Sequence, residues 1–388
     1  MIDVGPGKPI WAVGLMSGTS MDGVDAALLQ TDGETVSAFG PSVEISPAYS
    51  ADHRHLIDHA GFEITQQIEG QGVVDPALRA LAEQQIHDIH FAAIAALRAK
   101  LDNGQAEAAI GFHGQTVYHA PDKGLTAQLG DGGRLAALAG CPVVWDFRTQ
   151  DMVAGGEGAP LAPFYHFALA KKIGATQPLV FLNLGGVGNV TWVDPSAGGP
   201  EVPGALVAFD TGPANALVND WMQQKTGQPI DPDGAAAAKG SVAWHLLRGN
   251  AAQAYLDRRP PKSLDRNAFQ PVRKAVQDLS TEDGAATLTA FSAECVAASL
   301  SYMPVPPTRW LICGGGRHNA TMMRMLTERL DAPVDPVEAV GLDGDMLEAQ
   351  AFAYLAVRVL RGLPTSAPST TGCREPVCGG QISYPATR

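Results

Sequence analysis

Apolar residues in this chain alternate between short runs and longer stretches with helical spacing. Short runs bounded by glycine, serine or aspartate predict strands, at 10–16, 24–29, 35–45, 108–112, 142–145, 179–184, 190–193, 206–209 and 309–313. Helical spacing predicts helices over 52–61, 76–101, 215–224, 242–256, 285–301, 319–330 and 345–361. The Ser/Thr/Pro-rich stretch after Pro364 is expected to be extended. Strands alternating with helices predict an α/β protein.

The two halves of the chain begin in the same way, with a strand, a Gly-rich turn and a second strand. We therefore expect two sheets and an internal structural repeat, although the halves share little sequence. The expected domains are residues 1–150, completed by about 362–388 of the tail, and residues 151–361. The Gly-rich stretch from Gly155 to Pro163 interrupts the pattern and is expected to lie at a cleft or hinge.

Composition narrows the classes of protein. A chain of 388 residues that is 45% hydrophobic and 17% charged is long enough for two globular domains. A formal charge of −13 argues against nucleic acid and anionic membranes as partners. The five cysteines form no C-x-x-C pair, and the first residues hold no basic leader followed by an apolar stretch. These features predict a cytoplasmic protein without disulfides or membrane spans.

The turn SGTSMDGVD, from Ser17 to Asp25, carries the densest chemistry. It holds two glycines, three hydroxyls and two carboxylates in nine residues. Glycines let backbone amides approach a phosphate, and an aspartate suits a hydrated Mg²⁺. The alternative is a plain hairpin turn whose residues only satisfy backbone geometry. The chain has no Walker A sequence, and Thr191 occupies the place of the last glycine of a dinucleotide fingerprint. Three separate Gly-rich turns could instead clamp a nucleoside triphosphate between two domains.

Eight segments in this order resemble the anhydro-N-acetylmuramic acid kinases, over nearly the whole chain: GLMSGTSMDGVDAAL, GFHGQTVYH, DFRTQDMVAGGEGAPLAP, NLGGVGNVT, FDTGPANALVNDW, PPKS, CGGGRHN and EAQAFAYLA. The resemblance implies an actin/hexokinase/Hsp70-like ATPase fold, built from two ribonuclease H-like domains with nucleotide and sugar bound in the interdomain cleft. It also implies that ATP and water open the 1,6-anhydro ring of a muramyl sugar and that O6 is phosphorylated, in the recycling of peptidoglycan sugars. ATP and Mg²⁺ are the implied cofactors, and a homodimer is the implied assembly.

The resemblance assigns roles to particular residues. The implied catalytic carboxylates are Asp210, in the FDTGP segment, and Glu348, which faces the substrate. The first phosphate segment comprises Gly18, Thr19, Ser20, Met21, Asp22, Gly23, Val24 and Asp25, with Asp22 as the metal ligand. The other nucleotide contacts are Gly185, Gly186 and Asn189 in a second hairpin and Gly314, Gly315, Gly316 and Asn319 in a third turn.

Four residues near buried strands are candidates for binding the sugar: His113, Gln115, Thr116 and Arg148. His113 is alternatively a core histidine with its hydrogen bonds satisfied. Arg148 suits a substrate carboxylate or a phosphate, because a guanidinium binds either in bidentate fashion, but a structural ion pair is equally compatible with its position. For Asp210 the alternative is an ordinary helix N-cap, and for Glu348 a solvated residue at a helix N-terminus.

The chain departs from the family pattern at a few positions. Phe112 replaces a common serine before HGQT, and Glu157 replaces the usual glutamine. The residues after PPKS, Leu264 and Asp265, also differ from the commoner ones. The change at Glu157 alters the charge near the expected sugar site, so the family pattern does not predict which residues contact the sugar there.

The implied reaction is chemically reasonable for these residues. Opening an anhydro bond needs a base beside a water molecule, and an aspartate can be that base. Phosphoryl transfer to O6 then captures the departing oxygen. Two alternatives remain: another sugar kinase of the same superfamily that phosphorylates a free hydroxyl, and a non-enzymatic ATPase switch resembling Hsp70 or actin.

Overall fold

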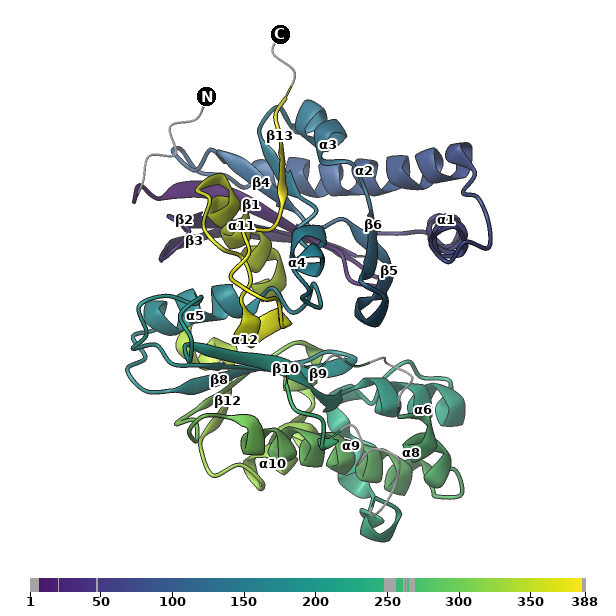
Figure 1. Ribbon diagram of the computed structural model, residues 1–388. Coiled ribbons are helices and arrows are strands. Elements are labelled where there is room, and N and C mark those ends of the chain that lie inside the picture. The colour runs from purple at the N-terminus through teal and green to yellow at the C-terminus, as the bar shows by residue number, and fades with distance from the viewer. Residues whose placement is uncertain are drawn as a thin grey trace. The chain divides into compact units, whose positions relative to one another are not determined.

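The computed structural model describes residues 7–19, 21–46, 48–247, 256–260, 262, 264 and 269–385. It divides into two compact units, unit 1 (residues 1–172 and 346–388) and unit 2 (residues 173–345) (Figure 1). These boundaries differ from the expected ones at 150 and 361. Helices α5 (Pro163–Lys172) and α11 (Leu347–Leu360) belong to unit 1, because α11 packs on strands of the first sheet and α5 packs on α11.

Unit 1 is built on a six-stranded sheet with the order β13-β7-β4-β1-β2-β3. Strands β1, β2 and β3 form an antiparallel meander, β4 and β7 run parallel to β1, and β13 pairs antiparallel with β7. The bounds are β1 (Ile10–Met16), β2 (Val24–Thr31), β3 (Val36–Ile45), β4 (Ala109–Phe112), β7 (Val143–Trp145) and β13 (Gln381–Ser383). A separate hairpin follows β4, comprising β5 (Gln115–Ala120) and β6 (Leu125–Leu129).

Side chains alternate across this sheet, so its two faces have different coverings. Alternate residues such as Val13 and Leu15 pack with the long helices in one core cluster. The opposite face meets α11 at Gly14 and Gly111, which are paired across β1 and β4. A Cβ at Gly14 would lie 1.7 Å from the carbonyl oxygen of Ala349, and one at Gly111 would lie 2.1 Å from that of Phe352. Two glycines therefore let the helix backbone lie directly on the strands.

The two long helices of unit 1, α1 and α2, begin where the sequence supplies side-chain caps. Ser50 caps α1 and Asp75 caps α2, and each side chain accepts a bond from a first-turn amide. The bounds are α1 (Ala51–Ile68), α2 (Pro76–Arg98), α3 (Gly132–Ala139), α4 (Thr149–Val153) and α12 (Pro368–Thr371), with a short 3₁₀ helix η1 (Pro121–Lys123).

Unit 2 is built on a five-stranded sheet with the order β10-β9-β8-β11-β12. Strands β8, β9 and β10 form an antiparallel meander, and β11 and β12 run parallel to β8. Helices α9 and α10 share a core cluster with alternate residues of these strands. The strands are β8 (Leu179–Leu184), β9 (Val187–Val193), β10 (Leu206–Pro213), β11 (Trp310–Cys313) and β12 (Val334–Pro336). The helices are α6 (Ala216–Thr226), α8 (Gln270–Ala275), α9 (Thr281–Ala298) and α10 (Ala320–Thr327), with 3₁₀ helices η2 (Pro232–Gly234), η3 (Ala237–Lys239), η4 (Trp244–Leu246), η5 (Ser299–Tyr302), η6 (Gly315–His318) and η7 (Val337–Val340).

The two units repeat one topology. In each, three antiparallel strands formed by consecutive segments are followed by two strands parallel to the first, on its other side. This is the ribonuclease H-like arrangement, so the two-unit α/β fold and the internal repeat are confirmed. Among the described residues no helix is both long and apolar enough to cross a bilayer.

Several local expectations were wrong. The stretch after Pro364 is not simply extended, because it contains α12 and β13. Val187–Asn189 and Asp210–Pro213 were expected to be turn residues and instead belong to strands β9 and β10, since both continue the ladder. The β5–β6 hairpin and helices α3, α4 and α5 were not predicted. Of the helix expected over 242–256, the structure shows only η4, and residues 248–255 lie outside the described part.

Candidate functional site

The first candidate nucleotide segment is the β1–β2 turn of unit 1. Side chains tie it to the segment after β4: Ser17 Oγ donates to Gln115 Oε1 at 2.8 Å, and Gln115 Nε2 donates to the Gly18 carbonyl at 3.1 Å. The hydroxyl of buried Tyr49 lies 3.4 Å from Ser17 Oγ. The turn closes by a bond from the Met21 amide to the Gly18 carbonyl, with Met21 in the left-handed region at φ 52°.

The side chains of this turn divide by exposure. Thr19 and Asp22 are exposed, and Asp25 is half-buried. Met21 and Val24 are buried in the core of unit 1. Val24 is fully buried, whereas Met21 still lines the larger of the two cavities described below. Ser20 lies outside the described residues.

Two of the predicted functional side chains, Arg148 and His113, contact each other in unit 1. The Arg148 guanidinium donates from Nη2 to His113 Nε2 at 2.9 Å and from Nη1 to the Gly158 carbonyl at 2.7 Å. Burial, together with the charge of Arg148, lowers the pKa of the His113 imidazole well below 6.5, so this ring is neutral and its Nε2 accepts. These bonds are not the structural ion pair considered for Arg148, because its partners are a neutral ring and a carbonyl. His113 Nδ1 is buried without a partner in the described structure, so the hydrogen bonds of this histidine are only partly satisfied.

Glu348 lies in the first turn of α11, the helix seated on Gly14 and Gly111, and its side chain reaches solvent. Desolvation by the surrounding protein raises the pKa of the Glu348 carboxyl, and the positive charge of Arg148 opposes this shift. Burial in turn lowers the pKa of Arg148 to about 10, against the opposing charges of Glu348 and Asp151. Arg148 is thus a cation at neutral pH that acts on both His113 and Glu348.

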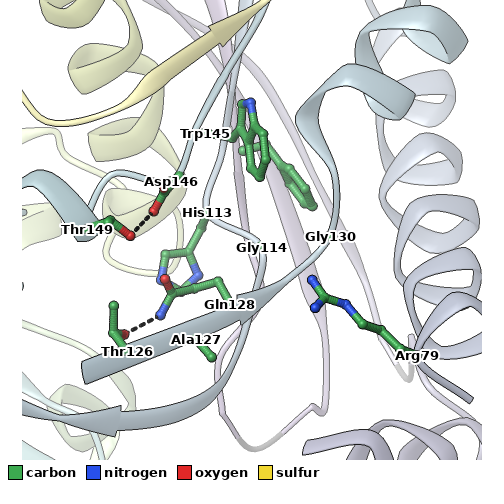
Figure 2. Close-up of a pocket in the computed structure, with 11 residues that line it drawn as sticks. Arg79, His113, Gly114, Thr126, Ala127, Gln128, Gly130, Trp145, Asp146 and Thr149 are labelled. Atoms are coloured by element: carbon green, nitrogen blue, oxygen red, sulfur yellow. Dashed lines mark hydrogen bonds between the residues drawn. The ribbon is translucent and has the colours of Figure 1, made fainter. Parts of the chain in front are cut away.

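Two cavities of unit 1 adjoin these residues. The larger, of about 470 Å³, is lined by Thr19 and Met21 of the turn, by residues 115–119 of β5 and by residues of α1 between positions 57 and 65. It brings the predicted phosphate turn and the predicted sugar contacts Gln115 and Thr116 to one space. The smaller, of about 230 Å³, is shown in Figure 2, and its polar lining residues include His113, Gln128, Asp146 and Arg79.

Asp210 is the predicted base, and it lies in unit 2 near the end of β10. It is half-buried, pairs with Asn189 of β9, and is followed by an irregularity in the ladder before Gly212. Its Oδ2 accepts a bond from the Leu264 amide at 2.8 Å, and its own amide donates to the Lys262 carbonyl at 3.0 Å. It is not a helix N-cap, because Asn215 occupies that position of α6.

The segment that holds Asp210 is anchored by a buried lysine. The Lys262 ammonium lies 4.7 Å from the Tyr302 ring centroid and 5.6 Å from that of Phe209, and it donates to the Leu256 carbonyl. Burial lowers the pKa of this ammonium, and nearby acids including Asp210 oppose the shift. The PPKS motif therefore supports Asp210, although its residues 261 and 263, and Asp265 beyond it, lie outside the described part.

The second hairpin turn, Gly185–Gly186, is held through its carbonyls. These accept bonds from the amides of residues 214–216 at the start of α6, and Asn215 Nδ2 adds bonds to the carbonyls of Leu184 and Gly185. Gly186 is exposed. Asn189, predicted with this turn, lies inside strand β9 opposite Asp210.

The third turn, at Gly314–Asn319, lies against β8. Gly314 has φ +71°, and a Cβ there would meet Asn183 Oδ1 at 2.2 Å, so glycine is required. Asn319 accepts a bond from the Met322 amide and caps α10, which occupies the side chain structurally. Arg317 within this turn is buried and paired with Glu338 and Asp345. Arg317 and Lys262 were not predicted from the sequence, although they lie inside the CGGGRHN and PPKS motifs.

Among the residues the structure describes, no three His, Cys, Asp or Glu side chains are arranged to hold a metal ion. Exposed Asp22 is the candidate carboxylate on the first turn. A single carboxylate beside phosphate oxygens suits Mg²⁺, which keeps several waters. The donor set of the turn therefore fits a Mg²⁺–nucleotide complex.

Two repeated sheets with Gly-rich first turns, and a carboxylate near the end of a strand, are the arrangement of the actin-like fold. A family model described as "Anhydro-N-acetylmuramic acid kinase" matches residues 11–385. The anhydro-N-acetylmuramic acid kinase of Roseobacter denitrificans is 52% identical over 379 residues, covering 98% of this chain and 96% of that protein. The one from Rhodospirillum rubrum is 49% identical, covering 97% and 95%. This chain belongs to the anhydro-N-acetylmuramic acid kinase family.

Among solved structures, a ROK family glucokinase from Streptomyces griseus in complex with glucose and AMPPNP aligns with a TM-score of 0.40 and 14% identity, covering 89% of this chain and 99% of that one.

Proposed function

We propose that this protein is an ATP-dependent kinase that hydrolytically opens 1,6-anhydro-N-acetylmuramic acid and phosphorylates O6, giving N-acetylmuramic acid 6-phosphate and ADP. Membership of the family over residues 11–385, with relatives about half identical along their whole length, carries this proposal. The segments quoted from the sequence supply the residue-level support.

Asp210 is the base in this proposal. A water oxygen attacks C1 of the sugar while Asp210 takes the water proton. The C1–O6 bond breaks, and its electron pair stays on O6, which forms the new bond to the γ-phosphorus as ADP leaves. Attack opposite O6 inverts the anomeric centre. The Leu264 amide donates to Oδ2 of Asp210, and this bond holds the orientation of the carboxylate that would take the proton.

ATP would be held by the three Gly-rich turns at Gly18–Asp25, Gly185–Gly186 and Gly314–Asn319. Mg²⁺, held by Asp22 and phosphate oxygens, would supply charge stabilisation for the transferring phosphoryl group. In unit 1, the exposed residue Thr19 would offer its hydroxyl to the phosphate oxygens.

The four residues proposed to contact the sugar differ in their hydrogen-bond partners, and we therefore assign them different roles. Thr116 lines the larger cavity and has a buried hydroxyl without a partner in the described structure, so we assign it to the sugar. Gln115 uses both ends of its amide on the phosphate turn, so we assign it to positioning that turn. His113 and Arg148 would set the charge and orientation of Glu348, the second proposed carboxylate.

Two further properties belong to this proposal, a homodimer and a cytoplasmic location. Both rest on the family resemblance. Light scattering of the purified protein tests the first: a mass of twice 40.5 kDa is expected.

Product analysis in ¹⁸O-water tests the activity. We expect ADP formation that depends on the anhydro sugar, ¹⁸O at the anomeric carbon and phosphate at O6. ADP formation only with an ordinary sugar would favour a kinase acting on a free hydroxyl. Slow ATP hydrolysis indifferent to sugar would favour an ATPase switch. Either result would overturn the proposed function.

A further inference from the structure

Arg317 lies in the third turn of unit 2, and its guanidinium has three bonding partners from three segments. Nη1 donates to the Gly314 carbonyl at 3.1 Å, Nε to Glu338 Oε1 at 2.8 Å and Nη2 to Asp345 Oδ2 at 2.7 Å. The Arg317 side chain is 3% exposed, whereas those of Glu338 and Asp345 are 45% and 61% exposed. We call these three residues the Arg317 clamp.

One end of the clamp holds the third turn against β8. A Cβ at Gly316 would meet Leu184 Cβ at 2.5 Å, so the turn lies directly on the end of this strand. The residues that follow Leu184 are Gly185 and Gly186, the second proposed phosphate turn. Arg317 therefore fastens the Gly314–Asn319 turn where this turn contacts β8. The same strand leads into the second proposed turn, Gly185–Gly186.

The other end of the clamp lies on the segment that leads out of unit 2. Glu338 belongs to η7, and Asp345 is the last residue of unit 2. Gly344 packs so closely that a Cβ there would lie 2.5 Å from Arg317 Nε. Helix α11 begins at Leu347, and Glu348 is three residues beyond Asp345 in the sequence.

We infer that Arg317 is a positioning residue for nucleotide binding, which holds the Gly314–Asn319 turn in its binding shape by tying it to Glu338 and Asp345. This inference rests on the proposed function, in which that turn contacts ATP. The same ties fasten the chain that leads into the helix of Glu348.

The chemistry of the clamp requires a guanidinium. Three acceptors in different directions match the planar fork of arginine, and the ammonium of lysine does not reproduce this geometry. Without the cation, the Glu338 and Asp345 carboxylates lose the partner they share, and the turn loses its tie to both. Hydrogen bonds from Arg317 hold the pKa of the Asp345 carboxyl below its usual value, which is consistent with an ion pair that persists at neutral pH.

The test compares Arg317→Ala with Arg324→Ala, a control in which an exposed arginine of the same unit loses a partner one helical turn away. We measure the dissociation constant of the non-hydrolysable analogue AMPPNP, and the kcat and KM for ATP and sugar. For Arg317→Ala we expect the dissociation constant and the KM for ATP to rise at least tenfold. Adding guanidinium ion at millimolar concentration should lower both toward the wild-type values. Arg324→Ala should stay within twofold of wild type, with or without guanidinium.

A folded Arg317→Ala that binds AMPPNP within twofold of wild type would overturn the inference, as would a lowered melting temperature without any change in the KM for ATP. If Arg317→Ala does not fold, Glu338→Gln replaces it, and a threefold or greater rise in the KM for ATP is then required. A wild-type protein that binds AMPPNP and converts the sugar keeps the proposed function intact even when the inference fails. A wild-type protein that does neither overturns both.

Discussion

The two units have the same strand order but hold their first turns by different means. In unit 1 the β1–β2 turn is held by side chains, through the Ser17 hydroxyl and the Gln115 amide. In unit 2 the β8–β9 turn is held mainly through its own carbonyls, which accept bonds from the start of α6. One topology therefore supports two kinds of loop: one that presents hydroxyl and carboxylate groups, and one that presents little but backbone.

Charge is distributed differently as well. Unit 1 contains buried histidines whose pKa values are lowered, and the Arg148 cation that lies between His113 and Glu348. Unit 2 contains Asp210, braced by a backbone amide, and the Arg317 clamp. Under the proposed function, each unit would contribute a distinct chemical task, and the experiments below test that division.

The largest effect is expected for Asp210→Asn. Loss of a general base lowers kcat by about 10²–10⁴-fold, while the amide keeps the size of the side chain and its bond from Leu264. Steady-state kinetics and a melting curve measure the two properties separately. Asp278→Asn, at an exposed position of unit 2, is the control. If Asp210→Asn turns over at nearly the wild-type rate, Asp210 is not the general base.

The next effect concerns how tightly the Gly314–Asn319 turn of unit 2 is packed compared with the β1–β2 turn of unit 1. Gly314→Ala places a Cβ 2.2 Å from Asn183 Oδ1 at a positive φ, so we expect a loss of about 1–3 kcal/mol in the free energy of unfolding together with weaker ATP binding. Gly23→Ala, where the nearest atom is the Ile45 carbonyl oxygen at 3.4 Å, should change stability by less than about 0.5 kcal/mol. Denaturant titration measures both. Equal losses would contradict the contrast between a packed turn and an open one.

A third effect is the dependence of unit 1 on pH. Burial lowers the pKa of five of its histidines below 6.5, to about 4 for two of them and to about 3 for a third: His87, His90, His113, His119 and His166. Below pH 6.5 the unfolded state binds these protons before the folded state does, so stability falls as pH drops from 6.5 toward 4. Hydrogen exchange of the unit 1 strands, corrected for intrinsic rates, measures this. His90→Leu should weaken the dependence, and a dependence unaltered by that change would count against the explanation.

The smallest effect is a shift in a pH profile. Arg148 lowers the pKa of Glu348, so Arg148→Gln should raise it and move the acid limb of kcat/KM to higher pH. The profile from pH 5 to 8 measures the shift. In Glu348→Gln this limb should disappear. A limb that moves to lower pH in Arg148→Gln would show that Glu348 is not the titrating group.

The sequence by itself determined most elements, because a strand or helix is encoded by the local period of apolar residues and by its caps. The runs at 10–16 and 179–184 coincide with β1 and β8, and Asn319 begins α10 as its position indicated. The repeat of two hairpins and the segments characteristic of the family could also be recognised in the sequence, since each is a contiguous stretch of chain. Weakly patterned elements such as β13 were missed, because pairing with β7 is what makes that segment a strand.

Only the tertiary structure decided which distant side chains meet. Gly14 and Gly111 are ordinary strand glycines in the sequence, and their task became visible when α11 was found lying on them. Arg317 bonds to residues 21 and 28 positions away, and Gln115 to residues 98 and 97 positions away. Such contacts depend on the path of the backbone between the partners, which no local period of the sequence encodes.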